Sequence, residues 1–196
     1  MYLILCGKSG SGKDTILKRL CKRGFTPIVS LTSRPIREGE TNGVEYNFVS
    51  RELFESLIRD GRLIEHRTYK TLVGGVEDTW YYGLEKTDVD LSKDYVVILD
   101  INGAESFMQY YGQENCFCIY IDACDEIRTE RAKKRGSYDE TEWNRRMEAD
   151  EKDFSYKNLL RVIHTVTTNE HLIADAVGQI IVQFDGYLEE RESKGE

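Results

Sequence analysis

The sequence predicts an α/β fold: a doubly wound parallel sheet that carries an inserted α+β region and a helical lid. Three observations support this prediction. Continuously apolar runs at 2–6, 95–99 and 116–121 have the composition of strands covered on both faces. Amphipathic segments separate the runs, so helical crossovers are expected to join parallel strands. Between 33 and 85 the pattern changes to short strand-like runs around one amphipathic helix, which predicts the insertion.

The first apolar run leads into a glycine-rich loop and then into an amphipathic helix. Glycines at three positions of the loop let its N–H groups turn inward as an anion nest, and Lys13 can reach bound phosphates. The order of strand, loop and helix predicts a phosphate loop (P-loop) that binds a nucleotide triphosphate. The residues predicted to hold that nucleotide are Gly7, Ser9, Gly10, Ser11, Gly12, Lys13, Asp14 and Thr15.

Asp14 departs from the usual pattern of this loop, because a serine or threonine is expected directly after Lys13. Two interpretations are open. Asp14 can hold Mg²⁺, directly or through a metal-bound water, where a hydroxyl usually does so. Alternatively, it only places a carboxylate in the first turn of a helix, where the helix dipole stabilises it by about 0.3–1 kcal/mol.

The next elements continue the βα pattern and then build the insertion. Gly24 is expected to end the first helix, and 26–31 is expected to be a second strand. A strand is predicted at 44–49, followed by a helix that Ser50 caps and Gly61 ends. Extended segments are predicted at 62–69 and 79–82, with a turn at Gly74-Gly75 between them.

The core pattern then resumes. The runs at 95–99 and 116–121 end at Asp100 and Asp122, and a helix with Ala104, Phe107 and Met108 on one face lies between them. A weaker strand is predicted at 161–166, then a closing amphipathic helix and a fraying polar tail from Glu189. Because parallel strands place their carboxyl ends at one edge of the sheet, Gly7, Asp100 and Asp122 are expected at the same edge.

Composition narrows the class of protein. With 196 residues and 40% apolar content, the chain can form one domain with a substantial core. A net charge of −8 gives no sign of nucleic-acid or membrane binding, so small-molecule partners are expected. The five cysteines lack metal-site spacing and are interpreted as reduced core residues. With no apolar stretch long enough for a membrane span and no signal-peptide pattern, the expected location is cytoplasmic.

Two basic groups are candidates for a second anion site and a lid. Arg34 and Arg37 follow the second strand and, with Tyr46 and a tyrosine at 81 or 82, could clamp a phosphate. The alternative is a solvated basic turn. A second group, which includes Arg131, Arg135 and Arg146, could close over a transferring phosphate or could simply mark charged helices.

Several runs of this sequence resemble guanylate kinases closely. The resemblance rests on Ser30-Leu31-Thr32-Ser33-Arg34-Pro35-Ile36-Arg37-Glu38-Gly39-Glu40, Asn42-Gly43, Tyr46-Asn47-Phe48-Val49-Ser50, Phe54 and Leu63-Ile64-Glu65-His66. It covers nearly the whole chain and implies ATP-dependent phosphorylation of GMP, with dGMP as a second candidate acceptor and Mg²⁺ as cofactor. It also implies a single domain over 1–196, with core segments 1–32, 86–127 and 147–190, a monophosphate-binding insertion at 33–85 and a lid at 128–146.

The resemblance assigns roles to residues by position. Arg34, Arg37, Tyr46 and Tyr82 match residues that hold the GMP phosphate, whereas Ser30, Glu65 and Asp100 match residues that contact guanine. The chemistry agrees, because the Glu65 carboxylate can accept hydrogen bonds from guanine N1–H and N2–H₂, donors that adenine lacks on that edge. The arginines that match the catalytic lid residues are Arg131, Arg135 and Arg146, which are expected to act together with Lys13.

Two departures keep other functions open. Leu84 stands where the family usually has a serine or threonine near guanine, and Asp14 follows Lys13. A Gly-Lys-Asp loop ending with a Tyr-Tyr-Gly run also resembles ribose 1,5-bisphosphate phosphokinases, although such a substrate has no base for Glu65 to recognise. A third hypothesis is a non-catalytic guanylate-kinase-like binding module, which an intact Lys13 and lid arginines disfavour.

Overall fold

The chain forms two compact units in a computed structural model that describes residues 1–37, 39–73, 76–87, 89–90, 92–134 and 138–194. The first unit combines Met1–Pro27 with Ser92–Glu196, and the second is Ile28–Leu91. The second unit therefore contains all of the predicted 33–85 insertion.

The first unit is built on a parallel sheet, as predicted. Its strands lie in the order β2-β7-β1-β8-β9, and each neighbouring pair is parallel. The strands are β1 (Tyr2–Cys6), β2 (Thr26–Pro27), β7 (Tyr95–Ile98), β8 (Cys116–Asp122) and β9 (Thr165–Thr168). The loops after β1, β7, β8 and β9 therefore start from one edge of this sheet, its carboxyl edge.

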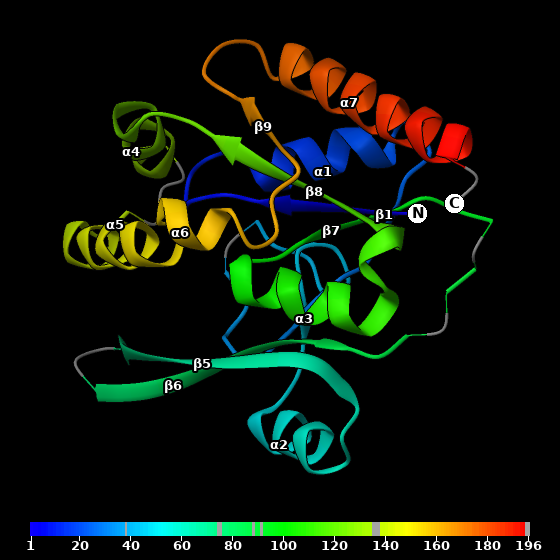
Figure 1. Cartoon of the computed structure of the whole chain (residues 1–196). Helices are drawn as coiled ribbons and strands as arrows, with labels where there is room; N and C mark the ends of the chain where they lie inside the picture. Colours follow the sequence, from blue (N-terminus) through cyan, green and yellow to red (C-terminus); the bar gives the residue numbers. More distant parts are fainter. Residues whose placement is uncertain (38, 74–75, 88, 91, 135–137, 195–196) are drawn as a thin grey trace. The chain divides into compact units, whose positions relative to one another are not determined.

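Helices cover both faces of the sheet, which confirms the doubly wound arrangement (Figure 1). Alternate side chains of β1, such as Leu3 and Leu5, pack with α1 (Lys13–Cys21) and α7 (Ile173–Lys194) in one buried cluster. On the opposite face, the ring of Tyr2 lies edge-on to Phe107 of α3 (Ile101–Tyr111), 5.2 Å away. Strands with apolar residues at every position suit this double covering.

The first unit also contains two charged helices that pack near the phosphate loop. These are α4 (Asp125–Lys133) and α5 (Glu140–Asp153), and the short α6 (Tyr156–Leu159) follows them. A single 3₁₀ turn, η1 (Gln113–Asn115), precedes β8. The buried Trp143 of α5 donates its indole N–H to Thr129 Oγ1 of α4 at 3.1 Å, which links the two helices.

The second unit has its own sheet, in the order β4-β3-β6-β5. The strands are β3 (Leu31–Thr32), β4 (Asn47–Phe48), β5 (Leu63–Val73) and β6 (Val76–Glu85). Helix α2 (Arg51–Arg59) begins at Ser50, whose Oγ accepts the Leu53 N–H as predicted. Because Phe54 and Leu57 of α2 pack with Leu31 and Tyr81, the helix covers one face of this sheet.

Four predicted elements differ in the structure. The strand predicted at 44–49 is reduced to β4 at Asn47–Phe48, because Val44 lies in a turn and its N–H donates to Thr41 O. The run at 26–31 is divided between two sheets, since Thr26–Pro27 pair with β7 whereas Leu31–Thr32 pair with β6. The prediction of a strand at 161–166 is wrong. The N–H groups of Val162 and Ile163 donate to Leu159 O in a helical turn, and β9 starts only at Thr165. Helix α7 continues to Lys194 instead of fraying from 189. The predicted turn at 74–75 lies outside the described residues.

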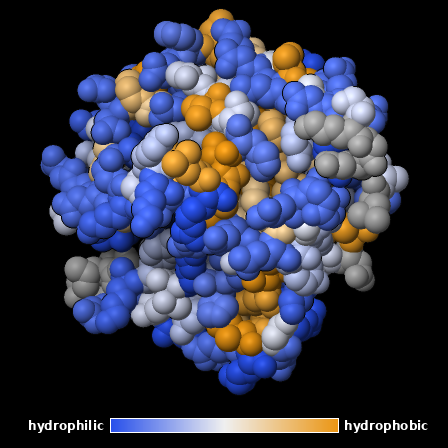
Figure 2. Space-filling view, in the orientation of Figure 1, coloured by the Kyte–Doolittle hydropathy of each residue, from blue (hydrophilic) through white to orange (hydrophobic). Residues whose placement is uncertain are grey.

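Charged and polar residues cover most of the face shown in Figure 2, with apolar residues in separate patches. The large apolar side chains that are fully buried belong mainly to the strands and to the inner faces of the helices. Among the described residues, no helix is both long enough and apolar enough to cross a membrane.

Candidate active site

The glycine-rich loop at 7–12 joins β1 to α1 at the carboxyl edge of the central sheet (Figure 1). Gly12 is the N-cap of α1 with a φ of 95°, and a Cβ on it would lie 2.4 Å from Asn169 Nδ2. Glycine is therefore required at this position. No side chain caps α1, so the N–H groups of its first turn remain available to an anion.

Lys13 points back into the loop. Its Nζ donates to Gly7 O at 2.6 Å and to Lys8 O at 3.0 Å, so the loop encircles the ammonium group. Burial lowers the pKa of Lys13 below its ordinary value, and the neighbouring Asp14 carboxylate opposes that shift. An anionic phosphate in the loop would favour the charged form of Lys13, so this lysine is suited to a polyphosphate ligand.

Asp14 and Thr15 are exposed in the first turn of α1. The Asp14 carboxylate has no hydrogen bond to any of the described residues, and it directly follows Lys13, the lysine predicted to bind phosphate. One such carboxylate together with substrate phosphates is the ligand set that Mg²⁺ usually takes. The residues present therefore fit a magnesium ion.

Arg131 and Asn169 hold the loop from the side of α4 and β9. Arg131 NH2 donates to Asn169 O at 2.7 Å, and Asn169 Nδ2 donates to Ser11 O at 2.7 Å. Arg131 NH1 lies 3.3 Å from Ser11 O. One of the arginines assigned to the lid therefore contacts the phosphate loop, and its catalytic role stays a prediction.

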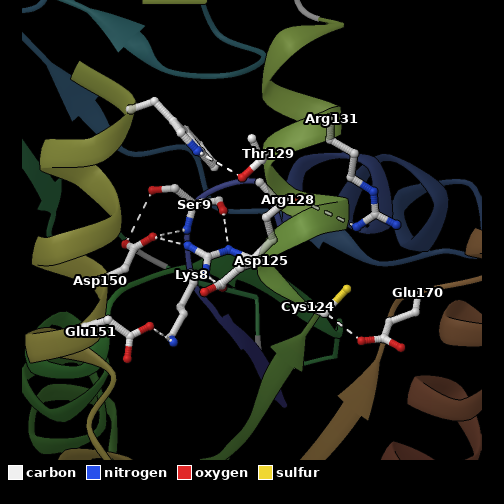
Figure 3. Close-up of polar contacts among 12 residues, drawn as sticks. Lys8, Ser9, Cys124, Asp125, Arg128, Thr129, Arg131, Asp150, Glu151 and Glu170 are labelled. Carbon is white, nitrogen blue, oxygen red and sulfur yellow. Dashed lines mark hydrogen bonds and ion pairs between the residues drawn. The ribbon is translucent and has the colours of Figure 1, made fainter. Parts of the chain in front are cut away.

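Ser9 is held by a buried ion pair between α4 and α5, which Figure 3 shows. Its N–H donates to Asp150 Oδ2 at 2.7 Å, and its carbonyl accepts from Arg128 Nε at 2.8 Å. The neighbouring Lys8 forms an ion pair with Glu151. The first half of the loop is thus fixed to the helical segment.

Of the two other arginines assigned to the lid, Arg146 is among the described residues. Arg146 of α5 donates from Nε to Glu142 Oε1 at 2.9 Å, in an ion pair that Arg145 shares. Arg135 lies outside the described residues. Their catalytic roles stay predictions.

In the second unit, Arg34 forms a buried two-point ion pair. Its NH1 and NH2 donate to Glu40 Oε2 and Oε1, both at 2.8 Å, and only 3% of Arg34 is exposed. Burial acts to lower the pKa of Arg34, but the hydrogen bonds to Glu40 raise it above its ordinary value. The Arg37 backbone N–H also donates to Glu40, at 2.8 Å. Glu40 thus orders both predicted phosphate-binding residues.

Aromatic rings surround the Arg34 guanidinium. Its Cζ lies 5.4 Å from the ring centre of Tyr46 and 5.3 Å from that of Phe48, and the Tyr46 and Tyr82 rings are 5.7 Å apart. The structure therefore brings together Arg34, Tyr46 and Tyr82, three of the four residues assigned to the acceptor phosphate.

Glu65 and Tyr82 lie on the sheet face opposite α2. Glu65 and Arg67 are two residues apart on β5, and Arg67 pairs with Tyr82 of β6, so all three share a face. A Cβ on Gly83, which pairs with His66, would meet Phe54 of α2, so those residues face the helix. The Glu65 carboxylate is 13% exposed and lies 3.8 Å from Arg67 Nε.

The two remaining residues assigned to guanine lie in different units. Ser30 precedes β3 in the second unit, and its carbonyl accepts the Asn47 N–H. Asp100 is the N-cap of α3 in the first unit, where its Oδ1 accepts the Gly103 N–H at 2.9 Å. A role in reading the base remains a prediction for both.

Sequence reasoning missed the carboxylates and the amide that hold the predicted residues in place. Glu40 lies in the run that resembles guanylate kinases but was given no role there, and Asp150 is 141 residues from Ser9 in sequence. Asn169 was accessible to prediction, because it directly follows a strand at the carboxyl edge where Gly7 and Asp100 were expected. The misplaced last strand concealed this signal.

The fold and this site define a class of protein, the P-loop nucleoside monophosphate kinases. A family model described as guanylate kinase matches residues 1–180. The chain is 30% identical to a guanylate kinase of Chlorobium luteolum over 97% of its own length and 94% of that protein. It is 32% identical to a guanylate kinase of Clostridium tetani, over 80% of this chain and 73% of that one.

Solved structures agree with these sequence relatives. The crystal structure of guanylate kinase from Anaplasma phagocytophilum superposes with a TM-score of 0.65 at 25% identity, covering 92% of this chain and 81% of that one. The chain belongs to the guanylate kinase family.

Proposed function

We propose that this enzyme transfers the γ-phosphoryl group of ATP to GMP, which yields ADP and GDP. The observation that carries the proposal is the phosphate loop with Lys13 inside it, on a chain of the guanylate kinase family. The loop N–H groups and Lys13 bind the triphosphate, and Arg131 stands at the same loop to neutralise charge that develops during transfer.

The acceptor site is assigned to residues of the second unit. The GMP phosphate is held by Arg34, Arg37, Tyr46 and Tyr82, and the first of these is already oriented by Glu40. Guanine is read by Ser30 and Glu65 of the same unit. Among the common bases only guanine offers the Glu65 carboxylate two adjacent N–H donors, which supports selectivity for guanine.

The reaction requires no general base. The attacking group is a phosphate oxygen of GMP, which is largely ionised at pH 7 because its second pKa is about 6. What the protein must supply is alignment of two anions and neutralisation of charge. Lys13 and the lid arginines Arg131, Arg135 and Arg146 are suited to that neutralisation.

ATP is expected to act with Mg²⁺, which Asp14 would hold together with substrate phosphates. When bound, the ion supplies positive charge at the transferring group. Lys13 and Arg131 bind and orient the same phosphates from the protein side.

A cytoplasmic location is part of the proposal. All five cysteines are free thiols, including the buried Cys6 and Cys118, whose sulfur atoms are 3.5 Å apart. Reduced thiols in such proximity are typical of a reducing compartment.

An acceptor panel tests the proposal. ATP consumption should be measured with GMP, dGMP, AMP, CMP, UMP and ribose 1,5-bisphosphate. We expect turnover with GMP, weaker or equal turnover with dGMP, and none above background with the other nucleotides. Turnover of the sugar bisphosphate without turnover of GMP would contradict the proposal, and ATP binding without any turnover would indicate a binding module.

A further inference from the structure

Among the described residues, Arg128 of α4 has the largest fully buried side chain, and the reaction described so far gives it no role. It lies between the phosphate loop and α5 (Figure 3). Burying a cation is costly unless it is paired and hydrogen-bonded, so the contacts of this residue require an explanation.

The Arg128 guanidinium uses all three of its nitrogens. Nε donates to Ser9 O at 2.8 Å, NH1 to Asp125 Oδ1 at 2.6 Å, and NH2 to Asp150 Oδ2 at 2.7 Å. Asp150 in turn accepts the Ser9 N–H at 2.7 Å and lies 3.3 Å from the Ser9 hydroxyl. One buried ion pair therefore holds the third residue of the loop by its N–H, its hydroxyl and its carbonyl.

This arrangement fixes the direction of the peptide groups that must bind phosphate. In a trans peptide the carbonyl and the following N–H point in opposite directions. Because Ser9 O is bonded to Arg128, the Gly10 N–H points away from that guanidinium. Ser11 O is bonded to Asn169, so the Gly12 N–H is directed away from that amide in the same manner.

The loop also lies directly against the backbone of α4. A Cβ on Gly10 would be 2.8 Å from Arg128 O and 3.2 Å from Arg128 Cα, and Gly10 has a φ of 80°. The loop has no room to relax toward the helix, so its conformation depends on the groups that hold its carbonyls.

We propose that Arg128, together with Asp150, is a positioning residue for ATP: the pair orients the Ser9–Gly10 peptide so that the loop is preorganised for the triphosphate. Arg128 acts through the loop and does not itself touch the nucleotide. The inference rests on the proposed role of this loop in binding ATP.

A positioning role can be separated from a structural one by removing the whole pair. Removing one partner of a buried ion pair strands the other and destabilises the fold, whereas replacing both with apolar groups is often neutral or stabilising. The double variant Arg128→Leu/Asp150→Ala is therefore expected to unfold at a urea concentration closer to that of the wild type than Arg128→Leu alone does.

The decisive measurement is ATP binding by the double variant. We expect its ATP dissociation constant to rise about tenfold or more, since at least one charge-assisted hydrogen bond to phosphate is misaligned. KM for ATP should rise in parallel, and KM for GMP should stay within about twofold, because the acceptor residues are held by other contacts. The matched control is Arg62→Leu, which removes the exposed ion pair with Glu85 and should leave ATP binding unchanged.

A folded double variant that binds ATP as tightly as the wild type overturns the inference. If the double variant does not fold, Arg128→Lys takes its place, because lysine keeps the charge but cannot reach three partners; an unchanged ATP dissociation constant in that folded variant also overturns it. Wild-type protein that binds no ATP would instead contradict the proposed function of the loop.

Discussion

Glu65 is the residue on which selectivity for the base depends. The prediction is that Glu65→Gln lowers kcat/KM for GMP about ten- to a hundredfold, because the amide replaces one acceptor by a donor and loses the charge that strengthens the hydrogen bonds. Steady-state kinetics with GMP and ATP varied separately should show the loss on the GMP side.

The ATP dissociation constant is the control for this substitution, and it should not change. An equal loss of kcat/KM for every accepted monophosphate would contradict the assignment of Glu65 to guanine. Because Glu65 lies near Arg67, thermal unfolding should accompany the kinetics to show that the variant is folded.

A second prediction for a single residue concerns Asp14 and the Mg²⁺ requirement of the reaction. If its carboxylate helps to hold Mg²⁺, then Asp14→Ser restores the hydroxyl that is usual at this position and changes the metal requirement. We expect a different Mg²⁺ concentration for half-maximal rate with saturating nucleotides. Because the Asp14 side chain is exposed, this variant should keep the wild-type fold.

Asp14→Asn is the matched variant, since it removes the charge but keeps one oxygen. An unchanged Mg²⁺ dependence in both variants would mean that Asp14 only places a negative charge at the start of α1. The expected stabilisation from that charge is about 0.3–1 kcal/mol, which denaturant unfolding can detect.

Helix α5 owes part of its stability to Glu142, which pairs with Arg145 and Arg146 on the same helix. The hydrogen bond from Arg145 is the largest influence that lowers the pKa of Glu142, to about 2. A lowered pKa in the folded state means that the stabilisation is complete above the unfolded pKa and is lost as the pH falls through the folded pKa.

The prediction for this element is a pH-dependent difference between the wild type and Glu142→Gln. Because the pair is partly exposed and screened by solvent, we expect the variant to be less stable by only about 1 kcal/mol at pH 7. The difference should shrink as the pH falls from about 4.5 toward 2. Urea unfolding at several pH values measures it.

Glu148→Gln is the matched control on the same helix. Glu148 is exposed, and no ion pair of its side chain is found in the described part of the chain. A loss of stability in Glu142→Gln that is the same at pH 7 and pH 3 would show that helix propensity, and not the ion pairs, is responsible.

At the scale of the molecule, the pattern of apolar residues predicted the buried strands of the central sheet. The strands β1, β7 and β8 are apolar at nearly every position because helices cover both their faces, so their pattern was readable without any knowledge of neighbours. The phosphate loop could also be predicted, because its glycines and Lys13 lie within one short run of the sequence.

The parts of the fold and of the site that were not predicted depend on contacts between segments that are distant in sequence. The run at 26–32 pairs with two different sheets, and nothing in its own composition says where it leaves one for the other. Asp150 holds Ser9 across 141 residues of sequence, so no local pattern could link them. Glu40 was close enough in sequence to be considered, but its two-point contact with Arg34 depends on the folded turn.

The division of the chain into two units leads to a prediction about the separate effects of the two nucleotides. The residues assigned to ATP, including Lys13 and Arg131, belong to the unit of Met1–Pro27 and Ser92–Glu196, whereas those assigned to the GMP phosphate belong to Ile28–Leu91. Binding stabilises the segments that it orders, by about 2.7 kcal/mol at a ligand concentration of 100 times Kd.

Hydrogen exchange with each nucleotide alone should therefore give two different maps. We expect ATP to slow exchange in the loop and at the start of α1, and GMP to slow it around β3, β4 and β5. CMP is the control for GMP and should protect neither unit, because it offers no guanine edge to Glu65. If GMP, added without ATP, protects the phosphate loop and leaves exchange in 28–91 unchanged, then the acceptor site is not in the second unit. That result would require a new assignment of Arg34 and Tyr82. The expected pair of maps would instead support ATP binding by the first unit and GMP phosphate binding by the second.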